Sequence, residues 1–149
     1  QPKVILEIGC GKGFWTQALV EGIKTYPGAF PPICVDVRDN LDPSLKAAVD
    51  FRCLDHDTFF LTTPPMMDAV IVDCAGSLCR RWFDERLWPL LKPGGFFLCH
   101  DTLTHEGPRA LEASFRDAPL TDGWGMPLGL PGLSDSGEPL EGVLLVRKA

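Results

Sequence analysis

The sequence has no apolar run close to the roughly 20 residues that a membrane-spanning helix needs, and nothing at its start resembles a signal peptide. Its six cysteines form no Cys-x-x-Cys pair and no zinc-ligand spacing. These absences argue against a membrane partner and predict free, largely buried thiols in a reducing, cytoplasmic setting. We expect residues 1–149 to form one domain. Because residue 1 is Gln rather than Met, we also expect helices upstream of it to be absent from this chain.

Clustered positive charge is also scarce. The chain has 14 Lys and Arg residues against 20 Asp and Glu residues, which gives a net charge of -6, and its closest basic cluster is Arg80–Arg81. Phosphate backbones are bound by grouped Lys and Arg side chains, so nucleic acid is not the expected partner. A G-x-x-x-x-G-K-[ST] phosphate loop is absent as well.

Strand-like and helix-like patterns alternate along most of the chain. The expected strands are 3–8, 32–37, 51–54, 68–73, 96–100 and 142–147, and the expected helices are 14–25, 43–49, 76–91 and 106–116. Near-continuous apolar strands are typical of a sheet that helices cover on both faces. Because crossovers between parallel strands are right-handed, the fold class is α/β with a doubly wound, mostly parallel sheet.

Acidic residues lie at or just past the carboxyl ends of five of these strands. They are Glu7, Asp36, Asp55, Asp73 and Asp101. The carboxyl ends of parallel strands share one edge of a sheet, and ligands of such folds bind beyond that edge. The pattern therefore predicts a ligand site at this edge.

The turn after the first strand is rich in glycine, with Gly9, Gly11 and Gly13 at every second position. Such a turn between a strand and a helix lets the backbone approach a nucleotide-like ligand. The dinucleotide fingerprint is G-x-G-x-x-G, so the third glycine comes one residue early for NAD. Glu7, before the turn, would repel a pyrophosphate and suits a cationic ligand, and Asp36 follows one βα unit later. An NAD-dependent oxidoreductase is therefore disfavoured.

Residues 7–13 resemble the E/D-x-G-x-G-x-G motif of class I S-adenosylmethionine-dependent methyltransferases, and the resemblance extends along nearly the whole chain. It implies a three-layer αβα fold with a seven-stranded sheet in the order 3-2-1-4-5-7-6, an antiparallel strand seven, and strand six within 120–130. Asp36 is similar to the acid that binds the ribose hydroxyls. Residues 91–95 are similar to the turn before strand five. The implied cofactor-binding residues are Glu7, Gly9, Cys10, Gly11, Gly13, Asp36, Val37, Asp55, His56 and Asp73.

The candidate catalytic residues are Asp73, His100 and Asp101, which end two neighbouring strands. Asp73 and Asp101 are similar to two of the three magnesium ligands in catechol-type O-methyltransferases. His100 departs from that pattern, because Mg²⁺ prefers oxygen ligands and a softer divalent ion better accepts an imidazole. Alternatively His100 is a general base near an acceptor hydroxyl, with His105 in the following loop as a weaker candidate.

The resemblance implies methyl transfer to a small-molecule acceptor, at a hydroxyl oxygen. Two alternatives remain open at this point. The first is an RNA methyltransferase, although no Lys ends strand 96–100 as in the ribose-methylating kind. The second is a domain that binds the cofactor or a partner without catalysis.

Apolar residues away from the edge are expected to pack. We expect Phe14 and Trp15 to take part in core and loop packing, and Trp82, Phe83 and Trp88 to lie in the core. One Gly/Pro-rich segment either lines an acceptor pocket or covers an edge of the sheet. Its apolar residues are Trp124, Met126, Leu128, Leu130 and Leu133.

Overall fold

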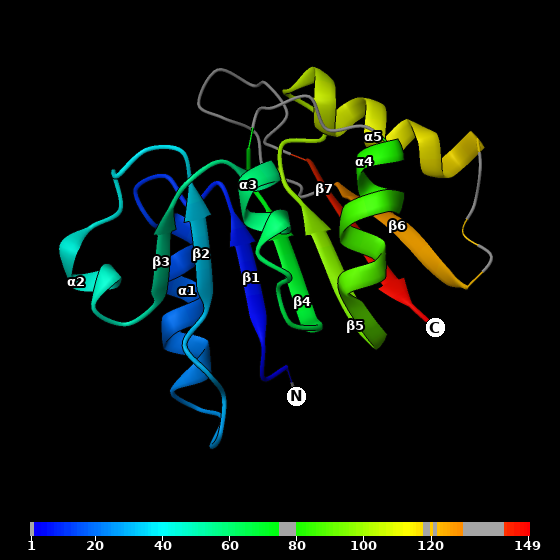
Figure 1. Ribbon diagram of the computed structural model, residues 1–149. Helices are drawn as coiled ribbons and strands as arrows, with labels where there is room; N and C mark the ends of the chain where they lie inside the picture. Colours follow the sequence, from blue (N-terminus) through cyan, green and yellow to red (C-terminus); the bar gives the residue numbers. More distant parts are fainter. Residues whose placement is uncertain (1, 75–79, 118–119, 121, 130–141) are drawn as a thin grey trace.

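The computed structural model describes residues 2–74, 80–117, 120, 122–129 and 142–149 (Figure 1). The strands are β1 (Ile5–Ile8), β2 (Ile33–Asp36), β3 (Asp50–Cys53), β4 (Met67–Val72), β5 (Leu91–Cys99), β6 (Gly123–Gly129) and β7 (Gly142–Lys148). The helices are α1 (Phe14–Ile23), α2 (Pro43–Lys46), α3 (His56–Leu61), α4 (Arg80–Trp82) and α5 (Glu106–Asp117). A π-helical turn (Phe83–Leu87) and a 3-10 turn (Trp88–Leu90) continue α4.

The seven strands form one sheet in the order β3-β2-β1-β4-β5-β7-β6. Strands β1 to β5 pair in parallel, and β7 runs antiparallel to both β5 and β6. The expected strand order and the antiparallel strand seven are thereby confirmed, and β6 lies inside the range expected for strand six. In Figure 1, α1 lies behind the sheet and α4 lies in front of it, which gives the three layers.

The core lies on both faces of the central strands. All four residues of β1 are buried, as expected for a strand in the middle of a covered parallel sheet. In front of the sheet, the Phe83 ring lies 4.9 Å from the Phe97 ring and 5.0 Å from the Phe115 ring, centroid to centroid. These edge-to-face contacts join α4's continuation, β5 and α5. Trp82 and Trp88 pack against this cluster while partly buried, so the expected aromatic core is present.

Two elements differ from the sequence-based expectation. Helix α3 was not expected, because 55–57 reads as the end of a strand; Asp55 begins the helix by accepting a hydrogen bond from the Thr58 amide at 2.9 Å. The expected turn at 92–95 belongs to β5, since Leu91 already pairs with Met67. An irregular register between Met67 and Ala69 absorbs the extra residues there. The first residues of the helix expected at 76–91 lie outside the described residues.

Two expectations about burial are wrong. Phe14 is 81% exposed rather than packed. Cys53 is an exposed thiol, because β3 is an edge strand. Trp124 and Met126 lie on the edge strand β6 and are each 45% exposed, so the choice between a pocket lining and a cover of the sheet edge stays a prediction. The side chains of Leu128, Leu130 and Leu133 lie outside the described part of the chain. Within that part, no helix has the length and apolar character to cross a bilayer.

Candidate functional site

The parallel register brings four chain segments out at one edge of the sheet. Ile8 pairs with Val35 on β2 and with Val72 on β4, and Val72 pairs with Cys99 on β5. The residues that follow these strand ends therefore lie side by side. This places the glycine turn, Asp36, Asp73 and His100 at the edge where the sequence predicts a ligand site.

A cavity of about 560 Å³ opens at this edge over β1, β2 and β4. It is large enough for a nucleoside-sized ligand, and it combines apolar side chains with a few polar groups. Six of the ten predicted cofactor-binding residues line it: Gly9, Gly11, Asp36, Val37, His56 and Asp73. The other lining residues are Ile8, Val35, Arg38, Asn40, Leu54 and Cys74.

The three glycines of the turn have different structural requirements. Gly9 has φ +84°, and a Cβ there would lie 2.3 Å from the Asp73 carbonyl oxygen. The backbone segments that follow β1 and β4 therefore approach so closely that position 9 requires glycine. Gly11 lines the cavity and donates its amide N–H to Asp36 Oδ2 at 2.8 Å. Gly13 has φ +103° and packs beside Leu41 and Leu45, on the side of α2 rather than on the cavity.

Asp36 is fixed by the backbone before any ligand contacts it. Its two carboxylate oxygens accept hydrogen bonds from the Gly11 and Arg38 amides, both at 2.8 Å. An ionised carboxylate held in this way still offers lone pairs to the cavity. It is thus suited to bind a vicinal diol such as that of a ribose.

Three predicted cofactor residues lie behind or beside the cavity rather than on it. Glu7 is 1% exposed, and its Oε2 accepts hydrogen bonds from the Thr16 hydroxyl at 2.7 Å and the Cys34 thiol at 3.3 Å. Burial raises the pKa of the Glu7 carboxyl, while these hydrogen bonds oppose the shift. Cys10 is buried beside Cys34, and Asp55 caps α3. Glu7 and Cys10 therefore stabilise the glycine turn without lining the cavity.

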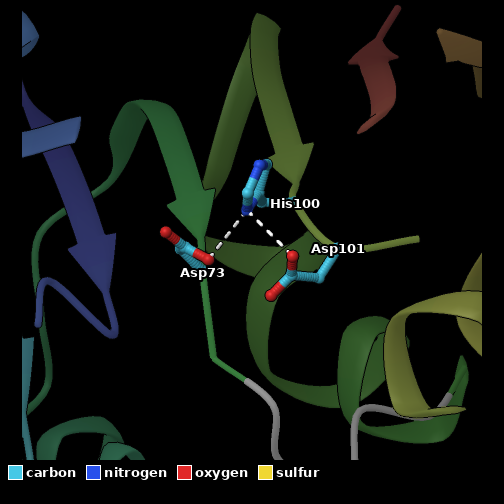
Figure 2. Close-up of side chains that lie close together, drawn as sticks. All are labelled: Asp73, His100 and Asp101. Atoms are coloured by element: carbon cyan, nitrogen blue, oxygen red, sulfur yellow. Dashed lines mark hydrogen bonds and ion pairs between the residues drawn. The ribbon is translucent and has the colours of Figure 1, made fainter. Parts of the chain in front are cut away.

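A compact cluster of Asp73, His100 and Asp101 lies beyond the ends of β4 and β5 (Figure 2). His100 Nδ1 is 3.0 Å from Asp73 Oδ1 and 3.3 Å from Asp101 Oδ1. His100 and Asp101 are each only 9% exposed, whereas the Asp73 side chain is 25% exposed. The structure therefore brings together all three predicted catalytic residues.

The backbone at Asp101 is unusual. Its φ of +64° lies in the left-handed region, which is unfavourable for most residues and less so for Asp. The turn that follows holds it there, because the amides of Thr104 and His105 both donate to the Asp101 carbonyl oxygen, at 3.2 and 3.0 Å. The Thr104 hydroxyl donates to Asp101 Oδ1 at 3.2 Å, and His105 Nδ1 lies 3.2 Å from Asp101 Oδ2.

Two further residues adjoin the cluster, and the sequence interpretation offered only the first of them as a candidate. His105, the weaker general-base candidate, contacts Asp101 from the i,i+4 position. The Trp15 ring packs edge-to-face on the His100 ring, with centroids 5.5 Å apart, and so connects α1 to β5. No sequence pattern indicated that Trp15 lies against His100, because the contact depends on how α1 crosses the sheet.

Asp73 belongs to both halves of the site. Asp73 lines the cavity, and its side chain contacts His100 in the cluster. A ligand filling the cavity would thus reach the cluster at Asp73. The arrangement offers one binding region for a nucleoside-like group and an adjacent polar region for a second reactant.

No family model matches the chain, and no curated protein does. Solved structures match over almost its whole length. An rRNA methylase from Streptococcus thermophilus shares 12% identity, with a TM-score of 0.67, over 98% of this chain and 86% of that one. The methyltransferase PaMTH1 from Podospora anserina, bound to SAH, shares 18% identity, with a TM-score of 0.65, over 99% of this chain and 72% of that one. The plantazolicin methyltransferase BpumL, in complex with SAH and a desmethyl plantazolicin analogue, shares 16% identity, with a TM-score of 0.61, over 100% and 78%.

The chain has the class I methyltransferase fold. Its strand order, its antiparallel β7 and the helices on both faces of its sheet agree with those neighbours. At identities of 12 to 18%, the likeness concerns the fold, and the assignment of individual residues depends on the geometry described above.

Proposed function

We propose that the chain is a methyltransferase that binds S-adenosylmethionine in the cavity and transfers the methyl group to a hydroxyl oxygen of a small molecule. The observation that carries the proposal is the position of Asp73, which lines the cavity and contacts the His100 side of the cluster. The donor site and a polar acceptor site are therefore adjacent. SAH in complex with the neighbours PaMTH1 and BpumL supports the choice of cofactor.

The cofactor roles follow from the cavity lining. Asp36 binds the ribose hydroxyls by charge-assisted hydrogen bonds. Leu54 and His56 lie on the β3 side of the cavity, where an apolar and aromatic environment suits the adenine ring. Gly9 and Gly11, which carry no side chain, leave room for the methionine portion. Glu7 acts indirectly, by ordering the turn through Thr16 and Cys34.

The transfer itself requires alignment more than acid–base chemistry, because the sulfonium is already a strong electrophile. The acceptor oxygen attacks the methyl carbon, the carbon–sulfur bond breaks, and its electron pair stays on sulfur to give SAH. The hydroxyl proton passes to the Asp73, His100 and Asp101 cluster, which lies next to the acceptor oxygen in this proposal.

Charge favours a small acceptor over RNA. Two carboxylates line the acceptor side, and the chain as a whole carries a net charge of -6. Both would repel a phosphodiester backbone. The rRNA methylase among the neighbours nevertheless makes RNA the acceptor to test as the alternative.

The test has two stages. Calorimetric titration of the purified protein with SAH, S-adenosylmethionine and NAD should show binding of the first two only, with micromolar affinity. Incubation with isotopically labelled cofactor, a metabolite pool or total RNA should then place the label in a small molecule. Absence of SAH binding below millimolar concentration would overturn the proposal. Label in RNA would replace the acceptor, and binding without any transfer would indicate a non-catalytic domain.

A further inference from the structure

The β3 side of the cavity includes an imidazole ring whose orientation needs an explanation. His56 is the first residue of α3 and lines the cavity, and its side chain is 35% exposed. Among the described residues its ring makes one ion-pair contact, from Nε2 to Asp57 Oδ1 at 3.9 Å. This separation is too long for a hydrogen bond. Because an imidazole turns about its side-chain torsions, packing must determine how the ring faces the cavity.

That packing comes from Trp82, the last residue of α4. The centroids of the Trp82 and His56 rings are 5.2 Å apart and the ring planes make an angle of 88°, which is an edge-to-face contact. Phe60, four residues after His56 in α3, makes a second such contact with Trp82 at 5.9 Å. Trp82 therefore contacts α3 at two points, and one of them is a residue that lines the cavity.

The backbone that carries His56 is held separately. Asp55 caps α3, because its carboxylate accepts hydrogen bonds from the Thr58 amide at 2.9 Å and the Thr58 hydroxyl at 2.6 Å. This cap fixes where His56 begins the helix, whereas Trp82 fixes how its ring is turned. The two determinants lie in different elements and can be changed independently.

Trp82 is itself anchored by the core. It is partly buried and packs against the hydrophobic cluster in front of the sheet. Its Nε1–H is buried and has no hydrogen-bond partner among the described residues. An unpaired buried donor costs free energy. The indole thus contributes at this place through its ring rather than through its N–H.

We propose that Trp82 is a positioning residue for the nucleobase of the cofactor: it fixes the His56 ring at the cavity wall, and His56 contacts the adenine. This role rests on the proposed function, which supplies the adenine. A ring that is already fixed loses little rotational freedom when the ligand binds, so preorganisation of His56 raises the affinity. Trp82 is not among the residues that line the cavity, so its effect must pass through His56.

Calorimetric titration of SAH into purified variants tests this role. Trp82→Leu should weaken SAH binding about 3-fold to 10-fold, as expected for loss of one edge-to-face contact. Trp82→Phe, which keeps an aromatic ring, should recover most of the loss. Trp88→Leu is the matched control, because Trp88 is also partly buried, packs on the same cluster and does not line the cavity. It should leave SAH affinity unchanged, and an equal loss in Trp88→Leu and Trp82→Leu would overturn the role.

A double-mutant cycle distinguishes action through His56 from a general effect on the fold. His56→Leu removes the ring that Trp82 positions. In that background, Trp82→Leu should cause no further loss of SAH affinity, because coupled residues are non-additive. Fold-losses that multiply in the double variant would contradict a role through His56.

The His56 ring also reports on the contact directly. The chain has three histidines, so its imidazole C–H signals in an NMR spectrum are few, and the signal absent from His56→Leu belongs to His56. Trp82→Leu should shift this signal, because the ring current of the indole is lost. Trp88→Leu should not shift it. A His56 signal that Trp82→Leu leaves in place would rule out the positioning contact.

The wild-type titration separates this role from the proposed function. If the wild type binds SAH and Trp82→Leu binds it equally well, the positioning role fails alone. If the wild type binds no SAH, the methyltransferase proposal fails, and the role of Trp82 fails with it.

Discussion

At the scale of single residues, Asp36 shows how the backbone prepares a side chain for a ligand. Two amides already hold its carboxylate at the cavity wall. Asp36→Asn keeps the shape, removes the charge and leaves one acceptor oxygen for the two amides. Hydrogen bonds to a charged group are worth about 1.5–3 kcal/mol. We therefore expect SAH affinity, measured by calorimetry, to fall about 10-fold to 100-fold. Asp117→Asn, an equal charge change at the exposed end of α5, is the matched control, and equal affinities of the two variants would contradict the ribose role of Asp36.

The buried Glu7 carboxyl leads to a prediction about how stability depends on pH. Burial raises the pKa of this carboxyl above its ordinary value of 4.5, so the folded state favours the protonated form more than the unfolded state does. The free energy of unfolding must then decrease as pH rises from that value through the raised pKa. Glu7→Gln removes the titrating group, so we expect it to unfold at higher temperature than the wild type at neutral pH.

The stability difference between Glu7→Gln and the wild type should shrink toward about pH 4, where both side chains are neutral. Thermal unfolding followed by circular dichroism at several pH values measures it. Glu21→Gln makes the same chemical change at an exposed position of α1 and is the matched control. A difference that stays constant with pH would argue against a raised pKa for Glu7.

At the scale of elements, a comparison of Gly9, in the turn between β1 and α1, with Gly28, after α1, separates two costs of replacing glycine. These costs are backbone strain and steric overlap. Gly9 and Gly28 both have positive φ, +84° and +80°. A Cβ at Gly28 meets nothing within 4 Å, whereas at Gly9 it lies 2.3 Å from the Asp73 carbonyl oxygen. We expect Gly28→Ala to cost about 1–2 kcal/mol from backbone strain alone.

Gly9→Ala should cost about 1–3 kcal/mol more, because β1 and β4 must separate to admit the methyl group. Urea unfolding measures both values. Gly9→Ala should also weaken SAH binding, since Gly9 and Asp73 both line the cavity. Equal destabilisation by the two substitutions would contradict the close packing at Gly9.

An element could be predicted from the sequence when the residues that determine it are close together in the chain. The β1 strand, the glycine turn and the start of α2 at Pro43 are local in sequence, and the sequence predicted them. The start of β5 was mispredicted because Pro93 and Gly94 are typical of a turn. Leu91 already pairs with Met67, and the residues up to Phe96 form an irregularity inside the strand rather than its beginning.

The same distinction holds for the site. Acids at strand ends predicted the edge and the Asp73, His100 and Asp101 cluster, because parallel register places strand ends together. The orientation of Cys10 and Gly13 toward α2 was not predictable, since it depends on the path of the turn after Gly9. Likewise the contact of His105 with Asp101 depends on the turn between β5 and α5.

At the scale of the whole molecule, the layers of helices determine which thiols react. Cys10, Cys34 and Cys99 are buried, and burial raises the pKa of each thiol, that of Cys10 to about 12. Both effects suppress alkylation, which requires an accessible thiolate. We expect iodoacetamide at pH 8 to label exposed Cys53 in the native protein and these three only after denaturation, as measured by peptide mass spectrometry.

Cys74 provides an internal check on this thiol experiment, because it is partly exposed and lines the cavity. Saturating SAH should slow its labelling and leave that of Cys53 unchanged. Rapid native labelling of Cys34 or Cys99 would contradict the packing of the sheet between its helices.

The left-handed backbone at Asp101 has a consequence for how sequence variation at this position can be interpreted. Asn and Gly tolerate the same conformation, so these two replacements keep the turn and delete the negative charge. Val, Ile and Thr resist the conformation, so they would disturb the turn and the charge together. In a library of all substitutions at position 101, protein abundance and methyl-transfer activity should therefore separate at Asn and Gly and fall together at the β-branched residues. Substitutions at position 101 thus separate the residue's contribution to folding from its contribution to the site.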